Sequence, residues 1–207
     1  MVIKVCGVKS PAGAIAISEL SPNLMGFIFH KPSPRDITPN AAQFNFSAIP
    51  QFIGKVAVFV DKPYDYIIGI VRHFGFNYVQ LHGNEPVSLC EKLRRDVKVI
   101  KAFGMESIFP VDVKQYANAA DLFLFDTHSA AHGGTGRKFN HELLEGYTLD
   151  VPFLLAGGIA PSDADLVKRI NHPAFAGVDL NSRFETSAGE KSVELLHQFF
   201  KSIQHES

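Results

Sequence analysis

Short runs of apolar residues recur along the whole chain, and polar segments separate them. Most of the runs are four to six residues long and consist mainly of Val, Ile, Leu and Phe. Near-continuous apolar runs of this length are typical of strands buried on both faces, as in parallel sheets. The pattern predicts eight strands, at Val2–Val5, Leu24–Phe29, Lys55–Val60, Tyr78–Leu81, Lys98–Phe103, Leu122–Phe125, Val151–Leu155 and Phe175–Leu180.

Several segments between these runs carry signals for helices. Three of the segments begin at proline, which is favoured in the first helical turn, and Ser10 is a suitable N-cap for the first of them. The last segment has apolar residues at helical spacing on one face. The predicted helices are Pro11–Leu20, Pro86–Arg95, a short one at Phe139–Gly146, Pro161–Ile170 and Ser192–Ile203.

The alternation of strands and helices favours one α/β domain, because no linker or low-complexity segment divides the chain. An open doubly wound sheet is the main alternative to a barrel. The first strand of a dinucleotide-binding sheet is normally followed by G-x-G-x-x-G, whereas this chain continues Gly7-Val8-Lys9-Ser10-Pro11. Eight strands with polar residues at their ends favour the barrel. We therefore expect a single-domain (β/α)8 TIM barrel over residues 1–207.

Composition narrows the possible partners. The 207 residues are 46% hydrophobic and 20% charged, with a net charge of −1, which is ordinary for a soluble globular protein. Neither nucleic acid nor a membrane is expected as a partner, since there is no basic excess and no apolar run of about 20 residues. Two cysteines make no disulfide framework, and the N-terminus lacks a signal-peptide pattern. We expect a cytoplasmic protein that is a monomer or a homodimer.

Polar residues gather where the predicted strands end. The C-terminal strand ends and the loops after them build the active site in a barrel of this kind. Strand alternation places Lys4 on the same face as Cys6, so Lys4 should lie below Cys6 in the barrel interior. In chain order, the polar groups are Cys6, Arg35, Asp61, Gln80, His82, Lys101, Asp126, Asp179, Asn181 and Ser182.

A phosphate site is predicted after the seventh and eighth strands. Gly157 and Gly158 follow the seventh strand, and Asn181 and Ser182 follow the eighth. Phosphate sites recur between these two loops in barrels, and glycine lets the backbone approach the anion. The alternative is that Gly157-Gly158 only forms a tight turn. Because Asn181 and Ser182 follow the eighth strand as well, a phosphate site is the favoured interpretation.

The segment 126–138 is long for a connection between a strand and a helix. Its Gly133-Gly134-Thr135-Gly136 centre suggests a lid or a backbone fitted to a ligand, with a surface loop as the alternative. His128, His132 and His141 lack a compact spacing for metal ligands, so no metal is expected.

The chain resembles the phosphoribosylanthranilate isomerase family of tryptophan biosynthesis. Each matching motif is short, but their order and spacing together are specific. The motifs are Lys4-Val5-Cys6-Gly7, Gly26-Phe27-Ile28-Phe29, Ser33-Pro34-Arg35, Val58-Phe59-Val60, Val79-Gln80-Leu81-His82-Gly83, Leu124-Phe125-Asp126-Thr127, Gly133-Gly134-Thr135-Gly136, Leu155-Ala156-Gly157-Gly158-Ile159 and Gly177-Val178-Asp179 with Ser182 and Glu185.

The resemblance implies an Amadori rearrangement of N-(5′-phosphoribosyl)anthranilate, a phosphorylated sugar amine, without a cofactor. Asp126 would act as the general acid that opens the ribose ring, and Cys6 as the general base. Arg35 would pair with the anthranilate carboxylate, as a planar guanidinium can. Gly157, Gly158, Asn181 and Ser182 would hold the phosphate, and Gln80, His82 and Asp179 would complete the substrate site.

This chemistry sets requirements on two pKa values. A free thiol with a pKa of about 8.5 is largely protonated at neutral pH, so the surroundings of Cys6 should lower its pKa, with Lys4 as the candidate cation. Asp126 must be protonated to act as an acid, so partial desolvation should raise its pKa. A buried structural pair of Lys4 with Asp179 is an equally good interpretation of these two charges.

Some positions leave alternatives open. Arg183 stands where the family usually has Gly, and it either adds a cation beside the phosphate or is a solvated surface residue. His82 either touches the ligand or only orders Gln80. Cys90, in a predicted helix, is interpreted as structural.

Two other functions compete with the main prediction. One is a different phosphosugar isomerase, such as the Amadori enzyme of the histidine pathway, and the other is a barrel that binds a phosphometabolite without catalysis.

Overall fold

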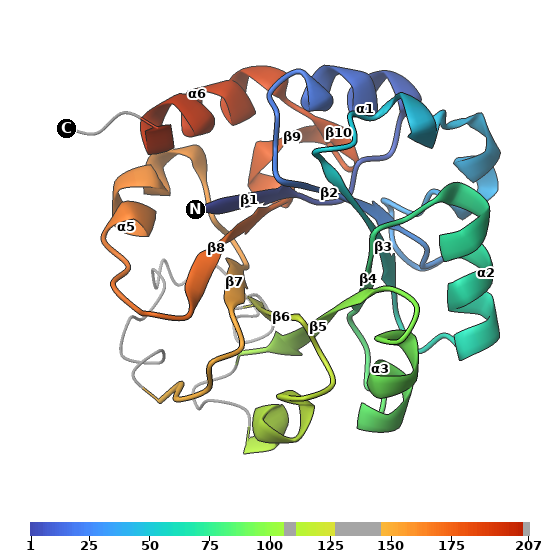
Figure 1. Cartoon of the computed structure of the whole chain (residues 1–207). Helices are drawn as coiled ribbons and strands as arrows, with labels where there is room; N and C mark the ends of the chain where they lie inside the picture. Colours follow the sequence, from blue (N-terminus) through green and yellow to red (C-terminus); the bar gives the residue numbers. More distant parts are fainter. Residues whose placement is uncertain (106–110, 127–145, 205–207) are drawn as a thin grey trace.

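Eight parallel strands form a closed barrel in the computed structural model, which describes residues 1–105, 111–126 and 146–204 (Figure 1). The strands follow one another around the barrel in sequence order, and the first pairs with the last to close the ring. The predicted barrel is thus confirmed. The strands are β1 Val2–Val5, β2 Leu24–Ile28, β3 Gly54–Phe59, β4 Tyr78–Leu81, β5 Lys98–Gly104, β6 Leu122–Asp126, β7 Phe153–Ala156 and β8 Phe175–Leu180.

The predicted strands agree closely with the observed ones. The bounds of β1, β4 and β8 match the prediction, β2, β5 and β6 differ by one residue at one end, and β3 differs by one residue at each end. The largest difference is at β7, which begins at Phe153 and not at Val151. Pro152 stands directly before β7 and has no N–H to donate to a neighbouring strand.

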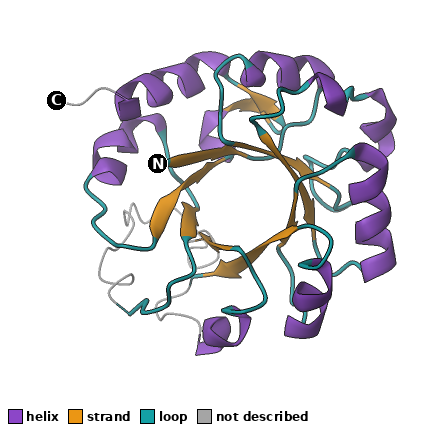
Figure 2. Cartoon of the chain, in the orientation of Figure 1, coloured by secondary structure: helices purple, strands orange, loops and turns teal. Residues whose placement is uncertain are grey.

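Helices surround the barrel (Figure 2). Ser10 caps the first one as predicted, because its Oγ accepts a hydrogen bond from Gly13 N at 3.2 Å. The predicted helix Pro161–Ile170 is wrong in its extent: a 3-10 turn at Pro161–Asp163 precedes a shorter α-helix. None of the helices in the described residues is long and apolar enough to cross a membrane. The α-helices are α1 Pro11–Ser18, α2 Tyr64–Phe74, α3 Val87–Leu93, α5 Ala164–Lys168 and α6 Val193–Gln204.

An α-helix and a β-hairpin in the described residues were not predicted from the sequence, nor were several short 3-10 helices. The α-helix is α2, which ends at Gly75 in the left-handed conformation with φ of 68°. Its buried residues Ile67, Ile68 and Val71 have helical spacing, and Gly75 is a typical C-cap signal, so the pattern was present. The hairpin is small and antiparallel, follows β8, and is formed by β9 Glu185–Ser187 and β10 Glu190–Lys191.

The apolar side chains form an inner and an outer core. Alternation along each strand separates the two, so that in β6 Leu122 and Leu124 belong to the inner group while Phe123 and Phe125 belong to the outer one. The inner core fills the barrel, and the outer core packs the strands against the helices. The inner group consists of Cys6, Leu24, Val56, Val58, Ile100, Ala102, Leu122, Leu124, Leu154 and Ala156.

Candidate active site

A cavity of about 180 Å³ opens at the C-terminal ends of the strands. It is lined by all ten residues that were predicted as catalytic or substrate-binding. These are Cys6, Arg35, Gln80, His82, Asp126, Gly157, Gly158, Asp179, Asn181 and Ser182. Asp61 and Lys101, which the sequence also indicated, do not line it. The barrel therefore brings together residues that are distant in sequence, as the predicted strand ends required.

A wider groove of about 800 Å³ lies at the opposite end of the barrel, where β5 begins. Charged side chains line it, and several of them pair with one another, such as Arg94 with Asp121 at 3.0 Å. It is lined neither by a thiol nor by any of the residues that the sequence indicated for the site. The smaller cavity is therefore the candidate active site.

Cys6 directly follows β1 and is 3% exposed at the floor of the cavity. Burial raises the pKa of its thiol above 9.0, and the nearby Lys4 only partly opposes this. The expectation that Lys4 would lower this pKa below its ordinary value is therefore wrong for the protein without substrate. Desolvation of the thiolate outweighs the attraction of the cation.

Lys4 and Asp179 form an ion pair beneath Cys6. Lys4 is completely buried, and its Nζ lies 3.0 Å from Asp179 Oδ1. Burial alone would lower the pKa of Lys4, but Asp179 and Cys6 together hold it above the ordinary value. The interpretation of these two residues as a buried pair is confirmed. Asp179 also lines the cavity, so the pair connects the barrel interior with the site.

Gly26 in β2 leaves the space that Cys6 occupies. A Cβ atom at this position would lie 2.7 Å from Cys6 Sγ and 3.2 Å from Lys4 Nζ. Both distances are shorter than van der Waals contact, so a side chain here would push the thiol or the ammonium group away. The sequence motif contained Gly26, but only the structure shows what the glycine accommodates.

His82 joins Gln80 to Asp126 across the cavity. Its Nδ1 lies 2.8 Å from Gln80 Nε2, and its Nε2 lies 3.7 Å from Asp126 Oδ2. His82 therefore orders Gln80 and also lines the cavity, while its contact with a ligand stays a prediction. Gln80 Oε1 is buried and has no hydrogen-bond partner among the described residues. An acceptor in this state has a free lone pair for a donor from a bound ligand.

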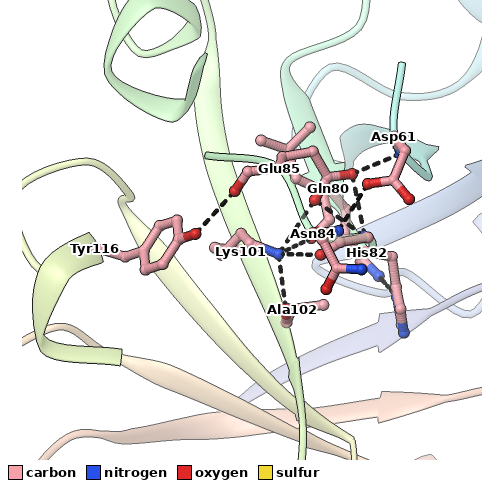
Figure 3. Close-up of polar contacts among 10 residues, drawn as sticks. Asp61, Gln80, His82, Asn84, Glu85, Lys101, Ala102 and Tyr116 are labelled. Carbon is pink, nitrogen blue, oxygen red and sulfur yellow. Dashed lines mark hydrogen bonds and ion pairs between the residues drawn. The ribbon is translucent and has the colours of Figure 1, made fainter. Parts of the chain in front are cut away.

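The loop that carries His82 is held by a buried pair, Glu85 with Lys101 (Figure 3). Lys101 Nζ lies 3.2 Å from Glu85 Oε2 and also donates to the carbonyl oxygens of Leu81 and Gly83. Glu85 accepts from the backbone N–H groups of Asp61 and Gly83. These bonds fix the loop on both sides of His82. The sequence placed Lys101 within the fifth strand, but gave no signal that Glu85 is its partner.

Arg35 forms a bidentate pair with Glu185 from β9. Arg35 Nε and Nη2 donate to the two carboxylate oxygens at 2.8 Å and 2.6 Å. Lys191 from β10 approaches the same carboxylate, with its Nζ 2.6 Å from Glu185 Oε1. Burial alone would raise the pKa of Glu185, but its hydrogen bonds with Arg35 and Lys191 hold that pKa below 4.5. Lys191 was missed because the hairpin that carries it was not predicted.

The predicted phosphate segment lies at one side of the cavity. Gly157 and Gly158 have φ of 93° and 72°, in the left-handed region that favours glycine. They line the cavity together with Asn181 and Ser182. Arg183 does not line it, and its side chain is exposed. Among the two alternatives for Arg183, the solvated residue is the one that the structure favours.

Some predicted features lie outside the described residues. They are the segment 127–138, most of the predicted helix Phe139–Gly146, and the three histidines His128, His132 and His141.

Comparisons with known proteins agree with this geometry. A family model described as N-(5′-phosphoribosyl)anthranilate (PRA) isomerase matches residues 3–202. An N-(5′-phosphoribosyl)anthranilate isomerase of Parabacteroides distasonis is 36% identical over 211 residues, covering 99% of this chain and 94% of that protein.

Solved structures give the same result. The crystal structure of phosphoribosyl anthranilate isomerase from Thermotoga maritima superposes with a TM-score of 0.83 at 28% identity, covering 99% of both chains. A phosphoribosyl anthranilate isomerase in complex with reduced 1-(o-carboxyphenylamino)-1-deoxyribulose 5-phosphate superposes with a TM-score of 0.80 at 27% identity, again over 99% of both chains. The chain belongs to the N-(5′-phosphoribosyl)anthranilate isomerase family.

Proposed function

We propose that this chain is an isomerase of tryptophan biosynthesis that converts N-(5′-phosphoribosyl)anthranilate to 1-(2-carboxyphenylamino)-1-deoxyribulose 5-phosphate. The observation that carries the proposal is one cavity, lined by the Cys6 thiol and the Asp126 carboxyl group, in a chain of this family. The reaction is an Amadori rearrangement, an internal transfer of hydrogen that changes an aldose derivative into a ketose derivative.

Asp126 and Cys6 divide the proton transfers between them in this proposal. Asp126 donates a proton to the ribose ring oxygen, and the bond from that oxygen to C1 breaks to leave a protonated imine at C1. The Cys6 thiolate then removes the proton from C2, and the electron pair of that C–H bond moves toward the imine to give an enolamine. Tautomerisation of the enolamine gives the ketone at C2. The substrate's own imine accepts the electron pair, so the residues need no cofactor for this step.

The high pKa of Cys6 in the free protein fits a base that ionises only with substrate in place. Burial holds the thiol protonated, whereas the imine formed after ring opening carries a positive charge close to it. A cation at this distance favours the thiolate. Lys4 and Lys191 act on Cys6 in the same direction. Asp126 must be protonated at the start, which stays a prediction for this residue.

Each of the two anionic ends of the substrate has a candidate binding group among the residues that line the cavity. The phosphate would bind to Gly157, Gly158, Asn181 and Ser182, where the glycine backbone is open to an anion. The anthranilate carboxylate would bind to Arg35, whose bonds to Glu185 use only Nε and Nη2. Gln80, His82 and Asp179 would contact the reacting sugar between these ends.

The direct test follows the fluorescence of phosphoribosylanthranilate, which is lost on turnover. We expect purified protein to remove it, and Cys6→Ser and Asp126→Asn each to lower kcat by about 10²-fold or more. Cys90→Ser is the matched control, because Cys90 is also a buried thiol but lies in α3, away from the cavity. It should keep wild-type kcat.

Two results would contradict the proposal. Folded wild-type protein that binds the substrate without consuming it would identify a binding barrel and not an enzyme. Full activity in the Cys6→Ser variant would remove this thiol from the mechanism. Circular dichroism of each variant confirms that the comparison is made between folded proteins.

We infer further that the protein acts in the cytoplasm as a monomer or a homodimer. Both cysteines are free and buried, which suits a reducing compartment. A solved relative from Thermotoga maritima is described as monomers generated from a dimeric phosphoribosylanthranilate isomerase. Light scattering of the purified protein distinguishes the two states, and any larger mass would contradict this inference.

A further inference from the structure

Lys191 is buried at the rim of the candidate active site, although it lies on a short hairpin outside the barrel (Figure 1). Its side chain is 1% exposed. Its Nζ donates to Glu185 Oε1 at 2.6 Å and to Asn181 Oδ1 at 2.7 Å. Burying an ammonium group costs free energy unless its hydrogen bonds are satisfied, so the contacts of Lys191 with Glu185 and Asn181 must offset this cost.

The hairpin places the two charges opposite each other. Lys191 pairs with Glu185 in the register of β9 and β10, which puts both side chains on one face of the hairpin. Gly189 in the turn adds a backbone N–H to Glu185 Oε1 at 3.2 Å. Two hydrogen bonds from within the hairpin, from Lys191 Nζ and Gly189 N, therefore fix the carboxylate of Glu185 independently of Arg35.

Arg35 is the other partner of this carboxylate and comes from the opposite side, after β2. Its guanidinium fork is fixed by Glu185 through Nε and Nη2, which leaves Nη1 outside the pair. One carboxylate between two cations gives the group Arg35–Glu185–Lys191 a net charge of +1 at the rim of the cavity. Such a group can take an additional anion without losing its internal pairs.

We propose that Lys191 is a positioning residue that fixes Glu185 and Asn181 and, through Glu185, aims Arg35 at the carboxylate of the substrate. The inference rests on the proposed function, because that function supplies the carboxylate. Lys191 itself need not touch the substrate. Its contribution is to keep the guanidinium in one orientation before binding, which reduces the entropy lost when the substrate binds.

The test compares ligands with and without the carboxylate. The first ligand is the reduced product 1-(o-carboxyphenylamino)-1-deoxyribulose 5-phosphate, and the second is its counterpart made with aniline. Wild-type protein should bind the first more tightly by calorimetry. We expect Lys191→Met to lower this preference by about tenfold, the order expected for one charged hydrogen bond, with little change for the aniline compound.

Two comparisons separate positioning from a general structural role. In an Arg35→Met background, Lys191→Met should have no further effect on the preference, since both changes act through one guanidinium. Lys55→Met is the control, because it also removes a lysine that donates a hydrogen bond, to Phe46 O at 3.3 Å, but Lys55 lies outside the cavity. The control should keep the wild-type preference.

Different outcomes overturn the role of Lys191 and the proposed function. An unchanged preference in folded Lys191→Met overturns the inference, and so does equal weakening of both ligands. If Lys191→Met does not fold, Glu185→Gln provides the same comparison, because it removes the charge that links Lys191 to Arg35. Binding needs no turnover, so a protein that binds these ligands but never isomerises the substrate would overturn the proposed function alone.

Discussion

The thiol of Cys6 shows how burial can oppose the chemistry proposed for a residue. The barrel floor removes the thiol from water, and Lys4 attracts the thiolate from below, but desolvation is the larger effect. Sequence spacing correctly placed Lys4 and Cys6 on one face of a strand. It could not give the pKa of Cys6, because spacing contains no information on how much water reaches a side chain.

The titration of the Cys6 thiol provides a testable prediction for this residue. Because burial raises its pKa, the thiolate of the free protein should form at a higher pH than the thiolate of an exposed cysteine. The difference in ultraviolet thiolate absorbance between wild type and Cys6→Ser reports Cys6 alone, because Cys90, whose pKa burial raises to about 11, is present in both proteins. A midpoint at or below that of an exposed cysteine in a short peptide would show that nearby cations outweigh burial.

At the level of secondary structure, a loop and a short hairpin outside the barrel strands hold the side chains of the site in place. The loop after β4 carries His82 and is fixed by Glu85 and Lys101, while the hairpin β9–β10 carries the pair that holds Arg35. Strand ends could be found from hydrophobic periodicity. The supporting pairs could not, because an ion pair between distant residues leaves no local pattern in the sequence.

The Glu85–Lys101 pair can be tested by removing the lysine. In Lys101→Met the carboxylate of Glu85 stays buried without its cation, which should cost about 3–5 kcal/mol of unfolding free energy. The kcat should fall as well, because the loop that orients His82 loosens. Arg72→Met is the control, since it breaks an exposed pair with Asp96 and should leave stability and kcat almost unchanged.

Urea unfolding and steady-state kinetics measure both effects. A Lys101→Met protein as stable as the wild type would show that water reaches Glu85. Lost stability with unchanged kcat would show that the loop does not depend on this pair for the orientation of His82.

The whole molecule depends on an outer core rich in phenylalanine. The chain has 18 Phe and no Trp, and rings from β2, α2 and the segments between them pack edge to face or stacked. This outer core holds the barrel against its surrounding elements. The barrel could be predicted from the count and spacing of strands. The helix α2, which was not predicted, contributes Phe74 to this core, although its apolar spacing and the C-cap signal at Gly75 are present in the sequence.

Phe46 lies at the centre of this outer core. Its ring centroid is within 5.2 Å of those of Phe27, Phe44, Phe74 and Phe76. We expect Phe46→Ala to lower the unfolding free energy by about 3–5 kcal/mol through the cavity it leaves. Phe52→Ala is the control, because Phe52 is 69% exposed and its loss should change stability by about 0.5 kcal/mol or less. Similar losses for both variants in thermal and urea unfolding would contradict a packed role for Phe46.

Closure of the barrel by β1 and β8 has a consequence during synthesis of the chain. Lys4 meets Asp179 across 175 residues of sequence, and the backbone N–H of Cys6 bonds to Leu180 O. Cys6 is therefore synthesised about 170 residues before the strand that closes the barrel beside it. During this interval the thiol is as accessible to oxidants and electrophiles as a cysteine in an unfolded peptide, and its protection begins only when β8 pairs with β1.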